Sequence, residues 1–192
     1  MKVEYLGGGF KPGEFMDQPL PEVAFIGRSN VGKSSLINML VNQRQMARVS
    51  NTPGRTQAIH FFAVADRFCL VDLPGFGYAK APKSVRKAWR PLVMSYLSNR
   101  PGLKMALLLL DIRREVRDEE IQLLSWLQDC EIPVLLVATK TDKIARTRRI
   151  GRLQKLASQM GMASGDIVGA SSLKREGRDV VWKRINQVLG GD

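Results

Sequence analysis

The sequence predicts an α/β fold in which helices cover both faces of a largely parallel sheet. Short apolar segments of strand length alternate along the chain with longer segments of helical spacing. Several of the strand-like segments are apolar throughout, which is typical of parallel strands buried on both faces. The length of 192 residues suits one well-buried domain. Together these observations predict a single α/β domain.

Each predicted element follows from its own pattern. The strands are the apolar runs 22–27 (EVAFIG), 58–64 (AIHFFAV), 67–72 (RFCLVD), 104–111 (KMALLLLD), 133–139 (PVLLVAT) and 166–171 (DIVGAS). The helices have apolar residues three or four apart, in 34–43 (SSLINMLVNQ), 84–99 (SVRKAWRPLVMSYLSN), 118–129 (DEEIQLLSWLQD), 146–160 (RTRRIGRLQKLASQM) and 179–190 (DVVWKRINQVLG). The second and third runs form a hairpin, which places one antiparallel strand at the edge of a six-stranded sheet. Residues 1–21 are rich in Gly and Pro and are expected to be an irregular lead-in to a domain at 22–192.

The charge balance points to a polyanionic partner. The chain carries 30 Lys and Arg against 18 Asp and Glu, so its formal net charge is +12. Such an excess favours nucleic acid first and an anionic membrane second, through long-range attraction and counterion release. Cys69 and Cys130 lack metal-ligand spacing and are typical of a reduced interior. The longest apolar run, 105–110, is too short to span a bilayer, so we expect a cytoplasmic protein.

A phosphate-binding loop is predicted at the end of the first of these strands. Residues 27–34 fill the pattern G-x-x-x-x-G-K-[ST], with Gly27, Gly32, Lys33 and Ser34 at the fixed positions. In such a loop, backbone N–H groups surround a phosphate chain, the lysine supplies a charge to the outer phosphates, and the hydroxyl reaches Mg²⁺. The alternative is a Gly-rich turn that merely starts a helix. The strand before the pattern and the amphipathic helix after it favour the phosphate site.

Two turn-rich loops carry further candidates for the same site. Asp72 ends a predicted strand and is followed by Pro74 and Gly75. Its carboxylate can hold Mg²⁺ through water, and the backbone N–H of Gly75 can contact a γ-phosphate. Thr56, in the long loop 47–57, has a hydroxyl that can complete the Mg²⁺ shell when triphosphate orders the loop. Each motif alone is equally compatible with an ordinary turn.

Segment 139–143 (TKTDK) follows a predicted strand and is a candidate for base recognition. The Asp142 carboxylate can accept two hydrogen bonds from the N1–H and exocyclic amine of guanine, which adenine does not offer in that arrangement. Lys140 can lie along the ring, and segment 171–173 can close over the base with a backbone N–H to guanine O6. The alternative is a solvated helix start with Thr as its cap. Four signals in one fixed order favour a guanine nucleotide.

These motifs, taken together and in order, resemble those of translation-factor-class P-loop GTPases. More narrowly, they are similar to the EngB/YihA/YsxC family of ribosome-biogenesis GTP-binding proteins, within the Era-like group. The segments that carry the resemblance are 27–38 (GRSNVGKSSLIN), 52–57 (TPGRTQ), 72–79 (DLPGFGYA), 139–143 (TKTDK) and 171–177 (SSLKREG). The resemblance spans the chain from about Glu22 onward. It implies a Ras-like P-loop GTPase domain that binds GTP or GDP with Mg²⁺.

The resemblance also implies roles for individual residues. Lys33, Thr56, Gly75 and Asn30 are expected to serve catalysis, and Ser34, Thr56 and Asp72 are expected to hold Mg²⁺. The nucleotide-binding set is Gly27, Arg28, Ser29, Asn30, Val31, Gly32, Lys33, Ser34, Ser35, Asp72, Pro74, Gly75, Thr139, Lys140, Asp142, Lys143, Ser171, Ser172 and Leu173. Thr139 stands where many GTPases carry Asn, so we expect its single hydroxyl to brace the phosphate loop more weakly.

Phe76 follows the D-x-P-G motif, where Ras-like switches place a glutamine that orients water. A phenyl ring can neither orient nor deprotonate water, so hydrolysis is expected to be slow or to depend on a group from elsewhere. In related Era-like GTPases an Asn at the position of Asn30 helps to hold a K⁺ ion that takes the place of an arginine finger. The resemblance therefore implies K⁺ as a further candidate cofactor.

The basic charge and the resemblance together predict the partner. Lys and Arg concentrate in 83–90, 113–117, 143–155 and 174–178, although any one run is compatible with a solvated helix face. For the resembled family the partner is the large ribosomal subunit or its precursor, with a role in normal cell division and growth. We expect a monomer without membrane association. The candidate contacts after the Asp72 loop are Tyr78, Arg86, Lys87, Trp89 and Arg90.

Other functions stay open at this stage. One alternative is a GTP-gated rRNA-binding module in which hydrolysis is incidental. Another is an Era-like GTPase in tRNA modification or membrane signalling, which the lack of an extra domain or membrane segment in this sequence makes less favoured. An ATPase is the least favoured, because Asp142 matches guanine.

Overall fold

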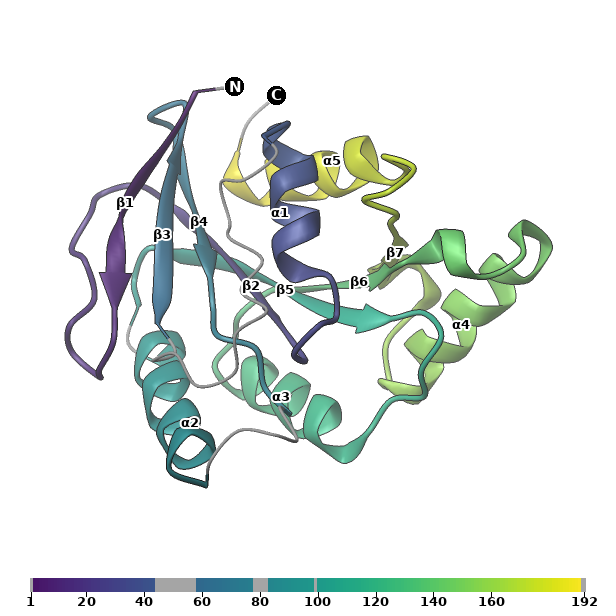
Figure 1. Cartoon of the computed structure of the whole chain (residues 1–192), viewed down its shortest axis with the longest axis horizontal. Coiled ribbons are helices and arrows are strands. Elements are labelled where there is room, and N and C mark those ends of the chain that lie inside the picture. Colours follow the sequence, from purple (N-terminus) through teal and green to yellow (C-terminus); the bar gives the residue numbers. More distant parts are fainter. Residues whose placement is uncertain (1, 44–57, 78–82, 99, 191–192) are drawn as a thin grey trace.

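The computed structural model describes residues 2–43, 58–77, 83–98 and 100–190, with the side chains of 83–86 left out. Within these residues seven strands form one sheet in the order β1-β3-β4-β2-β5-β6-β7. Strands β2, β4, β5, β6 and β7 run parallel to their neighbours in that set, and β3 is antiparallel to both β4 and β1. Figure 1 shows this sheet between two groups of helices.

The elements alternate as the sequence predicts. The strands are β1 (Val3–Gly9), β2 (Glu22–Gly27), β3 (Ile59–Val64), β4 (Phe68–Asp72), β5 (Leu103–Asp111), β6 (Val134–Thr139) and β7 (Ile167–Gly169). The α-helices are α1 (Lys33–Val41), α2 (Lys83–Ser98), α3 (Asp118–Asp129), α4 (Arg149–Gln159) and α5 (Arg178–Leu189). None of the described helices has the length and apolar character needed to span a membrane.

Both faces of the sheet are buried, which confirms the prediction from the wholly apolar strands. Helices α1 and α5 cover one face, and α2, α3 and α4 cover the other (Figure 1). Strand β2 shows that neither face of such a strand meets solvent: Ala24 and Ile26 face one core, and Val23 and Phe25 face the other. Four successive side chains of β2 are therefore fully buried.

The expectation of an irregular lead-in is wrong for residues 3–9. Strand β1 pairs antiparallel with β3, so the sheet has seven strands instead of the expected six, and β3 lies inside the sheet instead of at its edge. The pairing register shifts between Tyr5 and Gly7. Three consecutive glycines weaken any strand signal, because glycine has no side chain to pack and loses much entropy on ordering. They nevertheless suit this strand, because a Cβ on Gly9 would lie 2.8 Å from the backbone carbonyl oxygen of Glu14.

A buried ionic cluster holds the segment after β1 and the end of α2 together at the amino-terminal edge of β2. The Glu22 carboxylate is completely buried and accepts hydrogen bonds from the Tyr96 hydroxyl at 2.7 Å and from Nη2 of Arg100 at 2.7 Å. Arg100 also donates to the carbonyl of Met16, and Gln18 donates to Glu22. This cluster lies at the edge of the sheet opposite to the predicted nucleotide motifs, because Glu22 is the first residue of a strand whose last residue is Gly27.

Candidate nucleotide-binding site

The predicted motifs gather at one edge of the sheet, where the parallel strands end. Strands β2, β4, β5 and β6 run in one direction, so the loops that follow them share the carboxyl edge. The phosphate-loop candidates follow β2, and Asp72 is the last residue of β4. The base-recognition candidates follow β6 and β7. Thr56 lies outside the described residues.

The loop between β2 and α1 has the backbone geometry of a phosphate cradle. Helix α1 begins at Lys33, and Gly32 precedes it with a φ of 108°, which favours glycine. No described side chain caps the first turn of α1, so its N–H groups point to the loop as donors for an anion. Gly27 is enclosed, because a Cβ there would lie 3.0 Å from the carbonyl oxygen of Leu109. Asn30, which is exposed, has a φ of 62°.

The D-x-P-G segment lies directly against this loop. The backbone N–H of Ser29 donates to the Phe76 carbonyl at 2.8 Å, and the Phe76 N–H donates to the Gly27 carbonyl at 3.2 Å. Gly75 fits because a Cβ at this position would lie 3.2 Å from the backbone N of Ser29. On the other side, Nε1 of Trp89 donates to the Pro74 carbonyl at 2.7 Å. Gly75 is thus held within the reach of a phosphate chain bound at the loop.

Lys33 and Asp72 form an ion pair across the site, and both side chains are largely buried. Asp72 reaches this place because it is paired with Phe25, two residues before the end of β2. Its carboxylate and the hydroxyl of the neighbouring half-buried Ser34 are hard oxygen donors of the kind that Mg²⁺ prefers. The donor set therefore fits a Mg²⁺ ion bound together with phosphate. Ser35, the next residue of α1, is exposed.

Thr139 and Lys140 connect the base-recognition segment to the phosphate loop. The buried Thr139 hydroxyl lies 2.6 Å from the Val31 carbonyl oxygen and 3.1 Å from that of Leu110. One hydroxyl proton can serve only one of these acceptors at a time. The ammonium of Lys140 donates to the Asn30 carbonyl at 2.6 Å. Two side chains, one at the end of β6 and one directly after it, thus hold the backbone of the phosphate loop.

Asp142 is fixed by the loop that follows β7. The Ser171 hydroxyl, which is buried, donates to Oδ1 of Asp142 at 2.6 Å, and this bond is the main reason that the pKa of Asp142 lies below its ordinary value. Lys143 pairs with the other carboxylate oxygen at 3.5 Å. Ser172 is half-buried and Leu173 is 71% exposed. The carboxylate is therefore ionised and oriented, as an acceptor for two guanine donors must be.

Arg28 and Phe76 have side chains that turn away from the phosphate loop. The Arg28 guanidinium pairs with Glu119 and Glu120 of α3 and lies 5.8 Å from the centre of the Phe76 ring. The Phe76 side chain is 7% exposed and packs against Trp89 with 5.6 Å between ring centres. Arg28 therefore offers the nucleotide its backbone only. The position of Trp89 is explained by its packing against Phe76, so no stacked base is needed to explain it.

Two predicted contacts of the α2 region cannot be placed. Tyr78 lies outside the described residues, and so does the side chain of Arg86. Lys87 and Arg90 are exposed on α2.

Asp111 is a member of the site that the sequence analysis missed. It ends β5, is paired with Thr139 across the sheet, and accepts hydrogen bonds from Lys140 at 3.0 Å and from Arg113 at 2.7 Å. Burial alone would raise the pKa of its carboxyl, but these hydrogen bonds outweigh burial and lower it. Asp111 thus positions Lys140. Its place at the end of an apolar strand, as for Asp72, was the signal that could have identified it.

A largely parallel sheet with a Gly-rich strand-to-helix loop, a facing Asp, and an ordered carboxylate for guanine defines the class of P-loop GTPases. A family model described as a 50S ribosome-binding GTPase matches residues 22–140. The probable GTP-binding protein EngB of Syntrophotalea carbinolica is 50% identical, covering 97% of this chain and 90% of that protein. The protein of the same name from Citrifermentans bemidjiense is 46% identical, covering 98% and 88%. The chain belongs to the EngB family of GTP-binding proteins and is a GTPase.

Solved structures agree with this fold. A crystal structure of a probable GTP-binding protein EngB has a TM-score of 0.72 at 24% identity, covering 88% of this chain and 98% of that one. Era of Aquifex aeolicus, in a crystal structure with GDP and AlF₄⁻, has a TM-score of 0.68 at 22% identity, covering 90% and 57%. At these identities the likeness concerns the fold alone. The predicted Ras-like α/β fold is thereby confirmed.

Proposed function

We propose that this GTPase hydrolyses GTP slowly by itself and acts as a switch in the assembly of the large ribosomal subunit. The observation that carries the first part is Phe76, whose ring is buried against Trp89 at the position where Ras-like switches orient water with glutamine. The family description of a 50S ribosome-binding GTPase supports the second part. On this proposal the protein is a cytoplasmic monomer that is needed for normal growth and division.

In this proposal each described group has a defined task. Backbone N–H groups of 27–35 surround the phosphates, and Lys33 leaves its pair with Asp72 to neutralise charge on the outer phosphates. Ser34, Asp72 and Thr56 would hold Mg²⁺, which neutralises charge on the leaving diphosphate. The Gly75 N–H contacts the γ-phosphate, and Asp142 with Lys140 and segment 171–173 binds guanine. The buried Phe76 ring supplies no proton acceptor.

Asn30 is the candidate for recruiting a monovalent cation. Its side chain is exposed at the mouth of the phosphate loop, while its carbonyl is held by Lys140 at 2.6 Å, so the residue is fixed and accessible at once. An amide oxygen there can hold K⁺ near the phosphates, as in related Era-like GTPases. Turnover in equimolar KCl and NaCl tests this, with Asn30→Ala as the second sample. K⁺ should accelerate the unmodified protein and have little effect on the variant, whereas equal rates in both salts, with and without ribosomal particles, would exclude the idea.

Guanine recognition rests on Asp142. Asp142→Asn should weaken GTP binding by about two orders of magnitude or more and improve xanthosine triphosphate binding, because an amide reverses the donor pattern that the base must meet. Ser171→Ala is a useful companion, because it leaves the carboxylate in place and removes only the hydroxyl that orients it. Unchanged GTP affinity in Asp142→Asn would remove the assignment.

The ribosomal role is tested by sedimentation with purified large subunits and their precursors in GDP, GTP and a non-hydrolysable analogue. A switch requires that association depends on the nucleotide and ends after hydrolysis. The second candidate is a GTP-gated rRNA-binding module with incidental hydrolysis, which the burial of Phe76 favours. Single-turnover hydrolysis on large subunits distinguishes the two, because only the switch needs hydrolysis for release.

A further inference from the structure

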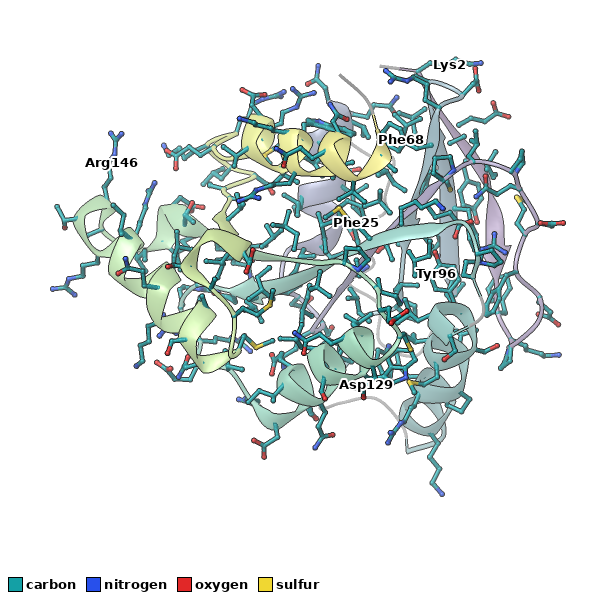
Figure 2. The ribbon with its side chains drawn as sticks, turned by 180° about the vertical axis from the view of Figure 1, so that it is seen from behind. Lys2, Phe25, Phe68, Tyr96, Asp129 and Arg146 are labelled. Atoms are coloured by element: carbon teal, nitrogen blue, oxygen red, sulfur yellow. The ribbon has the colours of Figure 1, made fainter. Side chains whose placement is uncertain are left out.

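The start of α4 and the loop after β7 carry a cluster of exposed positive charges. Arg146 and Arg148 are exposed in the 3₁₀ turn that leads into α4, and Figure 2 shows Arg146 at the outer tip of the molecule, pointing away from it. Lys174 and Arg175 are exposed in the loop that follows β7. We name these four residues the α4 basic face.

The two parts of the α4 basic face lie side by side. Nη1 of Arg149 pairs with Oε2 of Glu176 at 2.6 Å, and these residues are the direct neighbours of Arg148 and Arg175. The loop itself is fixed, because Ser171 and Glu176 exchange two backbone hydrogen bonds of 3.1 Å. The face is therefore a preformed surface, and part of it lies on the loop whose Ser171 orients Asp142.

The arrangement of charge at α4 is the opposite of what helix stability favours. Helix α3 begins with Asp118, Glu119 and Glu120, which suit the positive end of a helix dipole. Helix α4 begins with Arg149, is preceded by Arg148 and has no acidic residue in its first turn. The segment 143–165 contains six basic residues and no acidic one. The charges at the start of α4 therefore oppose the helix dipole, and Arg146 and Arg148 have no salt bridge among the described residues that would offset this.

Salt bridges within the described residues do not neutralise the charges of the α4 basic face. Arg152 and Lys155, further along α4, both pair with Glu115. In the part of the chain that the structure describes, by contrast, no carboxylate forms a salt bridge with any of the four residues of the α4 basic face. Between 143 and 184 there are 11 Lys and Arg against 3 Asp and Glu, a local charge of +8 out of +12 for the whole chain. The excess positive charge of the protein is thus concentrated here.

Two exposed apolar side chains border the same surface. Ile150, directly after Arg149, is 70% exposed, and Leu173, directly before Lys174, is 71% exposed. They are the most exposed of the large hydrophobic residues in the described part of the chain. A face that served solubility alone would not need them, whereas a contact surface commonly surrounds apolar side chains with charged ones.

We propose that the α4 basic face docks on the phosphate backbone of RNA. Guanidinium groups bind phosphate oxygens in pairs and shed water more readily than ammonium groups, so an arginine-dominated surface suits a phosphate polymer. A membrane partner would call for a broad apolar surface beside the charges, whereas the described residues beside this face expose two large apolar side chains, Ile150 and Leu173. That the RNA belongs to the large ribosomal subunit rests on the proposed function. The surface and its preference for RNA rest on the contacts described above.

The test compares two neutralised pairs on the face with one pair elsewhere. Arg146→Gln with Arg148→Gln, and Lys174→Gln with Arg175→Gln, remove two charges each from the face. The matched control is Arg67→Gln with Lys104→Gln, which removes two exposed charges at the opposite edge of the sheet. Affinity is measured for large subunits, for a double-stranded RNA hairpin and for phosphatidylglycerol vesicles over a range of KCl concentrations. GDP affinity and the unfolding midpoint of each variant establish that it is folded.

Each face variant should bind RNA and large subunits roughly tenfold or more weakly at about 0.1 M KCl, and its slope of log affinity against log salt should be smaller by about 1.5. The control should stay within about twofold of the unmodified protein. Face variants that bind as well as the control overturn the inference, as does binding to vesicles without binding to RNA. If the unmodified protein binds the hairpin through this face but does not bind large subunits, the proposed function fails and the inference stands. Binding to neither RNA would refute both.

Discussion

Replacing Thr139 tests how the base-recognition segment holds the phosphate loop. Its hydroxyl donates to the Val31 carbonyl at 2.6 Å, and both residues are almost wholly buried. Thr139→Val keeps the shape of the side chain and removes the donor. Leaving a buried carbonyl without its partner lowers stability by about 1–3 kcal/mol. Because Val31 belongs to the phosphate loop, about 1.4 kcal/mol of that loss should appear as roughly tenfold weaker GDP binding.

Thr139→Ser is the matched control, because it keeps the hydroxyl and loses one buried methyl group. That loss lowers the free energy of unfolding by about 0.8 kcal/mol. Both variants should therefore lose stability in urea denaturation, while only Thr139→Val loses nucleotide affinity in isothermal titration with GDP. Serine should stay within about twofold of the unmodified protein. If valine binds GDP normally, or if serine loses affinity as much as valine does, then the Thr139 hydroxyl does not brace the loop.

Three further predictions concern buried charges and the cysteines. Arg100→Met should lower the free energy of unfolding by about 3–5 kcal/mol in urea, because it leaves the completely buried Glu22 carboxylate without its cation; a loss below about 1 kcal/mol would contradict this account. The lowered pKa of Asp111 means that its ionised form adds stability above about pH 4 and that this contribution fades as the pH falls further. The stability gap between the unmodified protein and Asp111→Asn should therefore stay constant between about pH 7 and pH 5 and shrink below about pH 4, and a gap that stays constant down to about pH 2 would show that the charge is not involved. Burial raises the pKa of Cys69 to about 12, so iodoacetamide at about pH 8 should label the half-buried Cys130 and spare Cys69 in the native protein; equal labelling would indicate that the β4 region opens.

The parts of the site that lie on contiguous sequence could be predicted well. A strand, a Gly-rich turn and a helix start within 22–41 are local features, and each has its own residue pattern. The rule that parallel strands end at one edge then brings Asp72 and Asp142 to the same place without any knowledge of the strand order. Local pattern and topology together were enough to collect most of the candidate residues.

The contacts that fix these residues depend on side chains far apart in sequence, which a pattern does not pair. Asp111 reaches Lys140 because β5 and β6 are in a register that aligns Asp111 with Thr139. Another register would have separated them, and the sequence does not choose between registers of two uniformly apolar strands. Strand β1 was missed for a different reason. Its glycines count against a strand locally, yet they are required because segment 10–21 returns across the strand, with the Glu14 carbonyl 2.8 Å from where a Cβ of Gly9 would lie.

Phe76 affects the site in two ways, and only one of them can be predicted from the sequence. Its phenyl ring stands where a glutamine side chain would orient water, and this replacement is visible from the sequence. Its backbone, however, pairs with Ser29 and Gly27 of the phosphate loop, and its ring packs on Trp89 of α2, whose indole N–H holds the Pro74 carbonyl. Any movement of Gly75 toward a γ-phosphate must therefore shift its neighbours Pro74 and Phe76, and both of these contact Trp89 of α2. The same residue to which we attribute the proposed slow hydrolysis thus connects the phosphate loop to the helix that carries exposed Lys87 and Arg90.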